Sequence, residues 1–281
     1  MSNGALIFAH NNSSIDYVKL AVFAAQRVKQ YLDIPVSLVT ENSKWLSENY
    51  HEHPFDRIIS IQPEPAGQKV FYDGTMASKK LEWKNLSRNQ AYDLTPYDKT
   101  LVLDSDYILN SSILKSAFKT DSIFQLYKDS VDLAEWRDTS DVTRINTYSI
   151  PFYWATVFVF EKNNITQAFF DLVSYIKQNW LYFRVLYGIE AEMFRNDFAF
   201  SIAIHIMNGK VNGEFATLLP GKMFYAQDKD LLLEIKNDKM KFLVEKKDHL
   251  GEYIAAKTQG VDVHVMNKLS LTRVIDGGIG V

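Results

Sequence analysis

The chain has 281 residues, of which 47% are hydrophobic and 14% aromatic, so it is long enough to bury a large core. Its net charge of −3 provides no overall attraction to nucleic acid or to an anionic membrane, and the absence of cysteine excludes disulfides, thiolate metal sites and a cysteine nucleophile. Because no secretory signal is visible and the apolar run Trp154–Phe160 is far shorter than the ~20 residues that cross a bilayer, we expect a cytoplasmic protein without a membrane span.

The first sixty residues alternate short apolar strands with helices. Strands are predicted at Gly4–Ala9, Val36–Val39 and Arg57–Ile61, and helices from Ser13 or Ser14 to Leu32 and over residues 43–50. This β-α-β-α-β order predicts the start of a doubly wound α/β sheet with right-handed crossovers. The sequence contains neither a Gly-x-Gly-x-x-Gly fingerprint nor a P-loop, so a Rossmann dinucleotide site and a P-loop site are not indicated.

Polar side chains follow the first two predicted strands, at the edge where an open α/β sheet binds its ligand. These residues are His10, Asn11, Thr40 and Glu41. Turn and helix-cap roles explain the same residues equally well.

A loop rich in proline and glycine is predicted over residues 62–75, followed by a helix over Met76–Tyr92. On that helix Lys80, Lys84 and Arg88 would share one face, because they are spaced four residues apart. The simplest interpretation of the two lysines is a solvated face. Arg88 leads towards the next strand, where a guanidinium can bind a diphosphate or a sugar hydroxyl.

The stretch Thr100–Asn110 combines an apolar run with Asp104 and Asp106, two carboxylates separated by Ser105. The run is typical of a strand buried on both faces, and carboxylates at its end lie where such sheets bind ligands. Because like charges side by side repel, a cation between them is indicated, and hard divalent cations prefer oxygen ligands. An ordinary turn after a strand remains the alternative explanation of the Asp-x-Asp pattern.

The second half continues with strands and helices, and four of its segments are predicted as regular elements. These are strands at Ser122–Tyr127 and Tyr153–Glu161, and helices at Ile165–Trp180 and Glu190–Met207. Between the strands lies a polar segment that ends near Ser149 and is long enough to indicate function. Asp197 stands among phenylalanines, as a structural partner or as a residue facing a cleft. Near the end, His264 lies in the alternating stretch Val261–Lys268, where a core histidine is the commoner role.

The order of these motifs resembles glycosyltransferases of the GT-A type, especially the glycogenin and galactosyltransferase-like groups, in bacterial or phage form. The matching pieces are Arg88 and the following turn, Asp104-Ser105-Asp106, the strand Trp154–Phe160, Asn196-Asp197-Phe198, and His264 followed by Lys268. Trp154 stands where the family usually has asparagine and Phe198 where it has glutamine, and the His264–Lys268 spacing is shorter than usual.

The resemblance implies a GT-A fold, α/β with a mixed sheet and helices on both faces, and one domain over residues 1–281. Residues 1–110 would bind a nucleotide-sugar, and residues 111–281 would bind the acceptor and close over the metal and diphosphate. Asp104, Asp106 and His264 would hold Mn²⁺ or Mg²⁺. Lys268 and Arg88 would bind the diphosphate, with Arg273 as a further basic candidate. Ribose and base would contact Ser105 and the two strand ends, at Ala9, His10, Asn11, Thr40 and Glu41.

The implied reaction moves a sugar from a nucleotide-diphosphate sugar to an acceptor hydroxyl, and the similarity favours retention of configuration. Asp197, or a carboxylate of the 132–141 segment, would orient the acceptor or act as base. The acceptor stays open; a glycan is one possibility, and a modified base in DNA is another that the acidic total does not favour. A nucleotidyltransferase and a non-catalytic nucleotide-sugar-binding domain are the alternatives.

Overall fold

The centre of the computed structural model is a seven-stranded mixed sheet with the order β11-β8-β10-β6-β1-β2-β3. The structure describes residues 1–63, 65–84, 87–134, 137, 143–146, 149–246 and 251–277. The strands of this sheet are β1 (Asn3–Phe8), β2 (Val36–Thr40), β3 (Arg57–Ser60), β6 (Lys99–Asp104), β8 (Phe124–Tyr127), β10 (Trp154–Glu161) and β11 (Thr217–Leu218). Strands β3, β2, β1 and β6 are parallel, and β10 is antiparallel to both β6 and β8.

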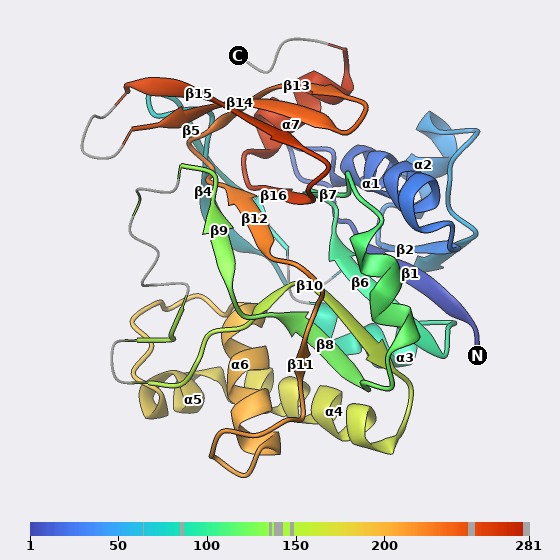
Figure 1. Ribbon diagram of the computed structural model, residues 1–281, viewed down its shortest axis with the longest axis vertical. Coiled ribbons are helices and arrows are strands. Elements are labelled where there is room, and N and C mark those ends of the chain that lie inside the picture. The colour runs from blue at the N-terminus through green and yellow to red at the C-terminus, as the bar shows by residue number, and fades with distance from the viewer. Residues whose placement is uncertain are drawn as a thin grey trace.

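Helices cover both faces of this sheet, as Figure 1 shows, with α1 and α2 on one side and α4 to α6 on the other. They are α1 (Tyr17–Leu32), α2 (Ser43–Asn49), α3 (Ala91–Leu94), α4 (Asn164–Gln178), α5 (Trp180–Leu186), α6 (Asn196–Met207) and α7 (Lys268–Ile275), with 3₁₀ turns η1 (Ser87–Gln90) and η2 (Ile113–Lys119). The two-sided cover explains the continuous apolar runs of β1, β6 and β10, whose residues are nearly all buried. The predicted fold class, α/β with a mixed sheet and helices on both faces, is confirmed. No helix in the described ranges is both long and apolar enough to cross a membrane.

A second, four-stranded sheet with the order β7-β16-β12-β9 joins the middle of the chain to its end. Its strands are β7 (Tyr107–Ile108), β16 (Val263–Val265), β12 (Met223–Ala226) and β9 (Ser130–Asp132). His264 lies opposite Tyr107 in the antiparallel pair of β16 and β7. This pairing brings the late histidine next to the residue that follows Asp106.

A β-hairpin replaces the helix that was predicted over Met76–Tyr92. Strands β4 (Gly67–Tyr72) and β5 (Ser78–Trp83) pair with each other, and only η1 and α3 follow as short helical turns. The prediction was wrong because the spacing of Lys80, Lys84 and Arg88 imitates a helix face, whereas Leu81 is buried with Phe71 from the opposite strand. The three basic residues therefore do not share a face. The helix predicted at Glu190–Met207 is also shorter and begins at Asn196.

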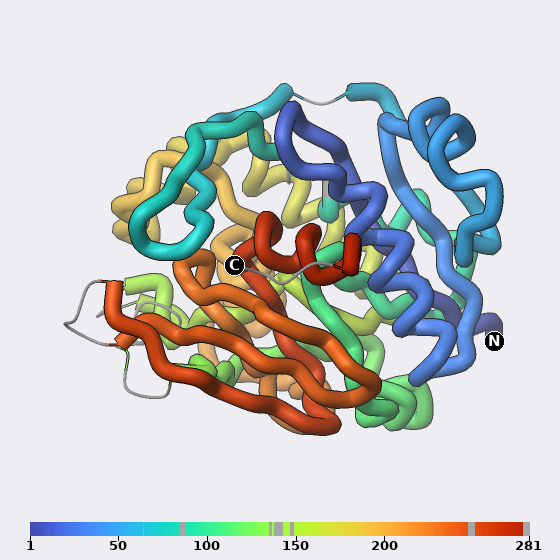
Figure 2. The backbone as a smooth tube through the Cα atoms, turned by 90° about the horizontal axis from the view of Figure 1, so that it is seen from above, coloured from blue at the N-terminus to red at the C-terminus, as the bar shows by residue number. Residues whose placement is uncertain are grey.

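The turn of this hairpin is held by the last part of the chain. There β13 (Leu231–Lys236), β14 (Lys239–Glu245) and β15 (Tyr253–Gln259) form a three-stranded antiparallel sheet, and α7 lies beside α1 (Figure 2). Arg273 of α7 makes a two-pronged ion pair with Asp73, with N–O distances of 2.7 and 2.8 Å. The Thr75 hydroxyl donates a hydrogen bond to Glu245. Arg273 thus anchors the hairpin, and it is not among the residues that line the cavity described below.

Replacing Arg273 by methionine is expected to loosen the hairpin turn. Both partners of the ion pair are about one-third exposed, so the pair contributes about 1 kcal/mol or less. Amide hydrogen exchange of the hairpin should then accelerate up to about fivefold, since RT is about 0.59 kcal/mol. Asp73→Asn and the double variant complete a mutant cycle. Fully additive effects of the two single changes would contradict the proposed anchoring.

Candidate metal and substrate site

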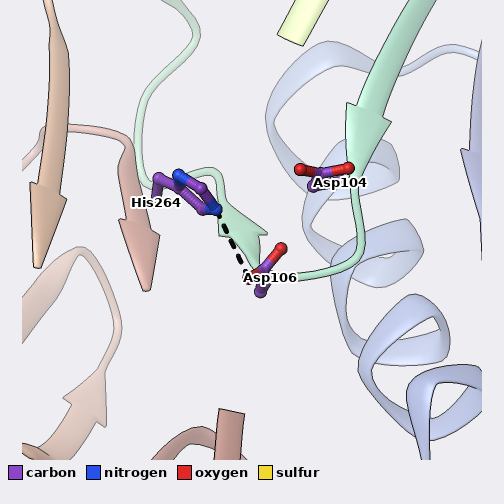
Figure 3. Close-up of side chains that lie close together, drawn as sticks. All are labelled: Asp104, Asp106 and His264. Atoms are coloured by element: carbon purple, nitrogen blue, oxygen red, sulfur yellow. Dashed lines mark ion pairs between the residues drawn. The ribbon is translucent and has the colours of Figure 1, made fainter. Parts of the chain in front are cut away.

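Backbone pairing alone brings Asp104, Asp106 and His264 together. Asp104 ends β6 beside Phe8, the last residue of β1, so it stands at the carboxyl edge of the main sheet. The chain then turns, and the carbonyl of Asp106 accepts a hydrogen bond of 2.9 Å from the amide of Val265. The neighbouring imidazole of His264 consequently points towards Asp106, with Nε2 3.3 Å from Oδ2 (Figure 3).

One ligand atom from each of these three side chains lies within 4.8 Å of the others. Two carboxylates and one imidazole form a donor set that suits Mg²⁺ or Mn²⁺, which favour oxygen ligands. Nδ1 of His264 is buried and makes no hydrogen bond to the described residues. The residues present therefore suit a divalent cation, and metal binding by them stays a prediction.

Each carboxylate of the trio also faces a cation that is buried or half-buried. The Lys268 ammonium lies 2.6 Å from Oδ2 of Asp106, and the Arg88 guanidinium forms an ion pair with Asp104. Burial alone would raise the pKa of Asp106, but Lys268 and His264 outweigh it and hold the pKa below its ordinary value. Burial lowers the pKa of Lys268, but the charge and hydrogen bond of Asp106, together with Tyr17 and Asp228, raise it above its ordinary value. Both groups are therefore charged at neutral pH, and the carboxylates are neutralised in the absence of a metal ion.

Arg88 links three elements of the fold. It is only 4% exposed, and its Nη1 donates a hydrogen bond of 2.7 Å to the carbonyl of Ala155 in β10, while the ion pair reaches Asp104 at the end of β6. Burial lowers the pKa of Arg88 to about 10, and the charge of Asp197 opposes that effect. The guanidinium thus lies against Asp104 as a fixed positive charge, and it also lines the cavity.

Asp197 lies in the first turn of α6, where the helix dipole favours a carboxylate. Its Oδ1 accepts a hydrogen bond of 2.9 Å from the amide of Ala155, and its Oδ2 lies 2.8 Å from Arg195. Burial raises its pKa, but Arg195 and Arg88 together lower it below the ordinary value. Because an efficient general base has a pKa near the working pH, this environment favours orientation over proton abstraction.

These groups open into one cavity of about 530 Å³. Its walls include the predicted site residues His10, Arg88, Asp104, Ser105, Asp106, Asp197, His264 and Lys268. A volume of this size accommodates a small organic ligand. The structure therefore brings eight of the predicted residues to one place, and their roles there stay predictions.

The other predicted residues at the strand ends do not line this cavity. Ala9 is buried and its amide bonds to the carbonyl of Val39. The side chain of Asn11 accepts a hydrogen bond from the amide of Val18, at the start of α1, and the Thr40 hydroxyl accepts one from the amide of Asn42. Glu41 forms an ion pair with Lys84 at 2.6 Å. The hydrogen bonds of Asn11 and Thr40 in the structure are those of a helix-cap residue and a turn residue.

The one carboxylate of the 132–141 segment that the structure describes, Asp132, does not lie in the wall of the cavity. Asp132 is 2% exposed and pairs with Arg137, which also binds Asp230. The remaining candidates Glu135, Asp138 and Asp141 lie outside the described residues. Asp132 thus stabilises the start of the segment and does not line the cavity.

Several cavity residues carried no signal in the sequence. Tyr17, Lys69, Trp83, Arg195 and Asp228 all line its walls. Lys69 and Trp83 reach the site only because β4 and β5 form a hairpin, and Asp228 follows β12, a strand that the apolar pattern did not reveal. The exception is Arg195: its position two residues before Asp197 in the sequence indicates a basic partner for that carboxylate.

Comparisons with known proteins give similarity of structure only. No protein-family model and no curated protein sequence matches the chain. The glycosyltransferase GlyE of Streptococcus pneumoniae TIGR4 is 12% identical, with a TM-score of 0.41 over 78% of this chain and 46% of that one. The galactosyltransferase LgtC, solved with donor and acceptor sugar analogs, is 14% identical, with a TM-score of 0.44 over 77% of this chain and 72% of that one.

The bifunctional IspDF from Campylobacter jejuni is similar to the same degree, with 12% identity and a TM-score of 0.43 over 79% of this chain and 50% of that one. The chain spans less than half the length of GlyE and half the length of IspDF. At these levels of likeness, a conclusion on function has to come from the chemistry of the cavity.

Proposed function

We propose that the protein is a metal-dependent glycosyltransferase that moves a sugar from a nucleotide-diphosphate sugar to an acceptor hydroxyl. The supporting observation is the meeting of Asp104, Asp106, His264 and Lys268 in one cavity at the carboxyl edge of the sheet. Ligands of open α/β sheets bind at this edge. A carboxylate–imidazole metal site with a lysine beside it offers two kinds of positive charge to a diphosphate.

In this proposal Asp104, Asp106 and His264 hold Mn²⁺ or Mg²⁺. When bound, the ion supplies Lewis-acid stabilisation of the negative charge that develops on the leaving nucleotide diphosphate. Lys268 donates hydrogen bonds to the phosphate oxygens. Arg88 holds the Asp104 carboxylate in place through their ion pair. His10 and Ser105 contact the nucleoside, since both line the same cavity at the ends of β1 and β6.

Asp197 orients the sugar or the acceptor hydroxyl, held by Arg195 and by the amide of Ala155. Its lowered pKa makes it a weak base, which is consistent with transfer that retains the anomeric configuration. The anomer of the product, measured by nuclear magnetic resonance, tests this part of the proposal.

A thermal-shift screen of nucleotide-sugars tests the donor assignment. A donor present at 100 times its Kd should stabilise the folded protein by about 2.7 kcal/mol. For a chain of 281 residues this corresponds to a rise in Tm of roughly 5 °C. The rise should require Mn²⁺ or Mg²⁺ and should disappear with a chelator, because the ion links the carboxylates to the diphosphate.

The same screen, combined with an assay of released products, separates the alternatives. A nucleotidyltransferase would be stabilised most by a nucleoside triphosphate and would release pyrophosphate. A binding domain would show the metal-dependent shift without any hydrolysis or transfer of the sugar. Either result would contradict the proposed reaction.

A further inference from the structure

The inner face of the β4–β5 hairpin presents one basic side chain to the cavity. Lys69 lies opposite Leu81 in the hairpin, and Phe71, two residues along β4, is on the same face. Leu81 and Phe71 are 8% and 4% exposed and pack into the core, whereas Lys69 lines the cavity. Lys80 lies on the opposite, exposed face and does not line it.

Lys69 differs from the other cations of the cavity wall in its partners. Lys84, Arg88, Arg195 and Lys268 each form an ion pair with a carboxylate. Within the described part of the chain, no carboxylate oxygen lies within 4.0 Å of the Lys69 ammonium, and its recorded neighbour is the ring of Phe71 at 5.7 Å. Among the described residues, the Lys69 side chain therefore lines the cavity without a carboxylate in contact with its ammonium.

Lys69 is a solvent-exposed residue, and the charges of the cavity wall act on its ammonium. Desolvation and the positive charges of Lys268 and Arg195 lower the pKa of Lys69 to about 8, and the negative charges of Asp228 and Asp106 oppose that effect. A divalent cation bound to Asp106 would compete with Lys268 for the negative charge of that carboxylate. The two ammoniums, which belong to residues lining the same cavity, would then favour an anion with several acceptor oxygens.

We propose that Lys69 is a binding residue for a phosphate-type anion, carried into the cavity by the hairpin and acting beside Lys268. This inference rests on the proposed function, which places a diphosphate at the metal site. The hairpin turn is tied to the last part of the chain by Arg273–Asp73 and Thr75–Glu245, and these contacts hold in place the strand that carries Lys69. The anion is either the donor's diphosphate or a phosphate carried by the acceptor.

Calorimetry with two probes distinguishes these sources. Inorganic pyrophosphate with Mn²⁺ represents the donor's diphosphate, and inorganic phosphate added after saturation with Mn²⁺-pyrophosphate represents the acceptor group. Lys69→Met should weaken one of the two by about tenfold or more, because a charge-assisted hydrogen bond is lost. Lys69→Arg should recover most of the affinity, and Lys80→Met should bind both probes like the wild type.

Loss on pyrophosphate assigns Lys69 to the donor, and loss on phosphate alone assigns it to the acceptor. Unchanged binding of both probes by a folded Lys69→Met protein would overturn the inference and leave the proposed function standing. Failure of the wild-type protein to bind Mn²⁺-pyrophosphate would instead count against the proposed function itself, and the inference would fail with it.

Discussion

Replacing Asp106 by asparagine is expected to lower metal-dependent sugar transfer on the order of 10²- to 10³-fold. A metal ion supplies several kcal/mol of charge stabilisation in the transition state, and each 1.36 kcal/mol corresponds to tenfold in rate. Asp106 offers a carboxylate at the centre of the trio and also holds Lys268 at 2.6 Å. Mn²⁺ affinity, measured by calorimetry, should fall together with the rate.

The variant needs a control for folding, since removal of the carboxylate leaves the Lys268 ammonium buried without its partner. His264→Gln removes the third ligand while both ion pairs remain, and it should weaken Mn²⁺ binding in a stably folded protein. Asp171→Asn changes an exposed carboxylate of α4 and should behave like the wild type. Unchanged turnover and unchanged Mn²⁺ affinity in Asp104→Ala/Asp106→Ala would end the metal assignment.

Arg88→Met is expected to lower the free energy of unfolding by about 3–5 kcal/mol in the absence of metal. This is the usual effect of removing one partner from a buried ion pair. The substitution leaves Asp104 without its counter-charge and the carbonyl of Ala155 without a donor. Denaturant titration with circular dichroism measures the change.

Mn²⁺ should restore part of the stability lost in Arg88→Met, because a divalent cation neutralises Asp104 in place of the guanidinium. The stabilisation by Mn²⁺ should therefore be larger in the variant than in the wild type. Arg57→Met, at an exposed position of β3, should change stability by no more than about 0.5 kcal/mol. An equal effect of Mn²⁺ on both proteins would show that the cation does not bind at Asp104.

The main sheet was predictable because its strands carry their own signal. β1, β6 and β10 are buried on both faces, so each appears in the sequence as a short unbroken apolar run. Because Asp104 is the last residue of β6, the predicted strand also placed this carboxylate at the carboxyl edge of the sheet. These features are visible in a few residues, because a strand covered on both faces carries an apolar side chain at nearly every position.

The hairpin and the late strands were not predictable in this way. In β5 the sequence Lys79-Lys80-Leu81-Glu82-Trp83 consists largely of residues that favour helices, and its strand pairing with β4 depends on burial of Leu81 and Phe71 in the second core cluster. Tertiary packing decided the structure against local propensity. Lys69 was missed for the same reason, because its segment was predicted as a loop.

The candidate site was predictable in part through its resemblance to a known family. Asp104 and Asp106 were visible from local pattern, whereas the link to His264 depends on the pairing of β16 with β7, which no local pattern encodes. The predicted contacts of Asn11, Thr40 and Glu41 followed from their positions after strands. In the structure the side chains of Asn11 and Thr40 accept hydrogen bonds from backbone amides, Glu41 pairs with Lys84, and the predicted nucleotide contacts stay a prediction.

The pairing of β7 with β16 has a consequence for assembly of the proposed metal site. The proposed third ligand, His264, lies far along the chain from Asp106 and comes close to it only through this pairing. A chain shortened before Val263 would carry the two aspartates without the histidine. Under the proposed function such a shortened chain should therefore bind Mn²⁺ more weakly than the folded protein with β16 in place.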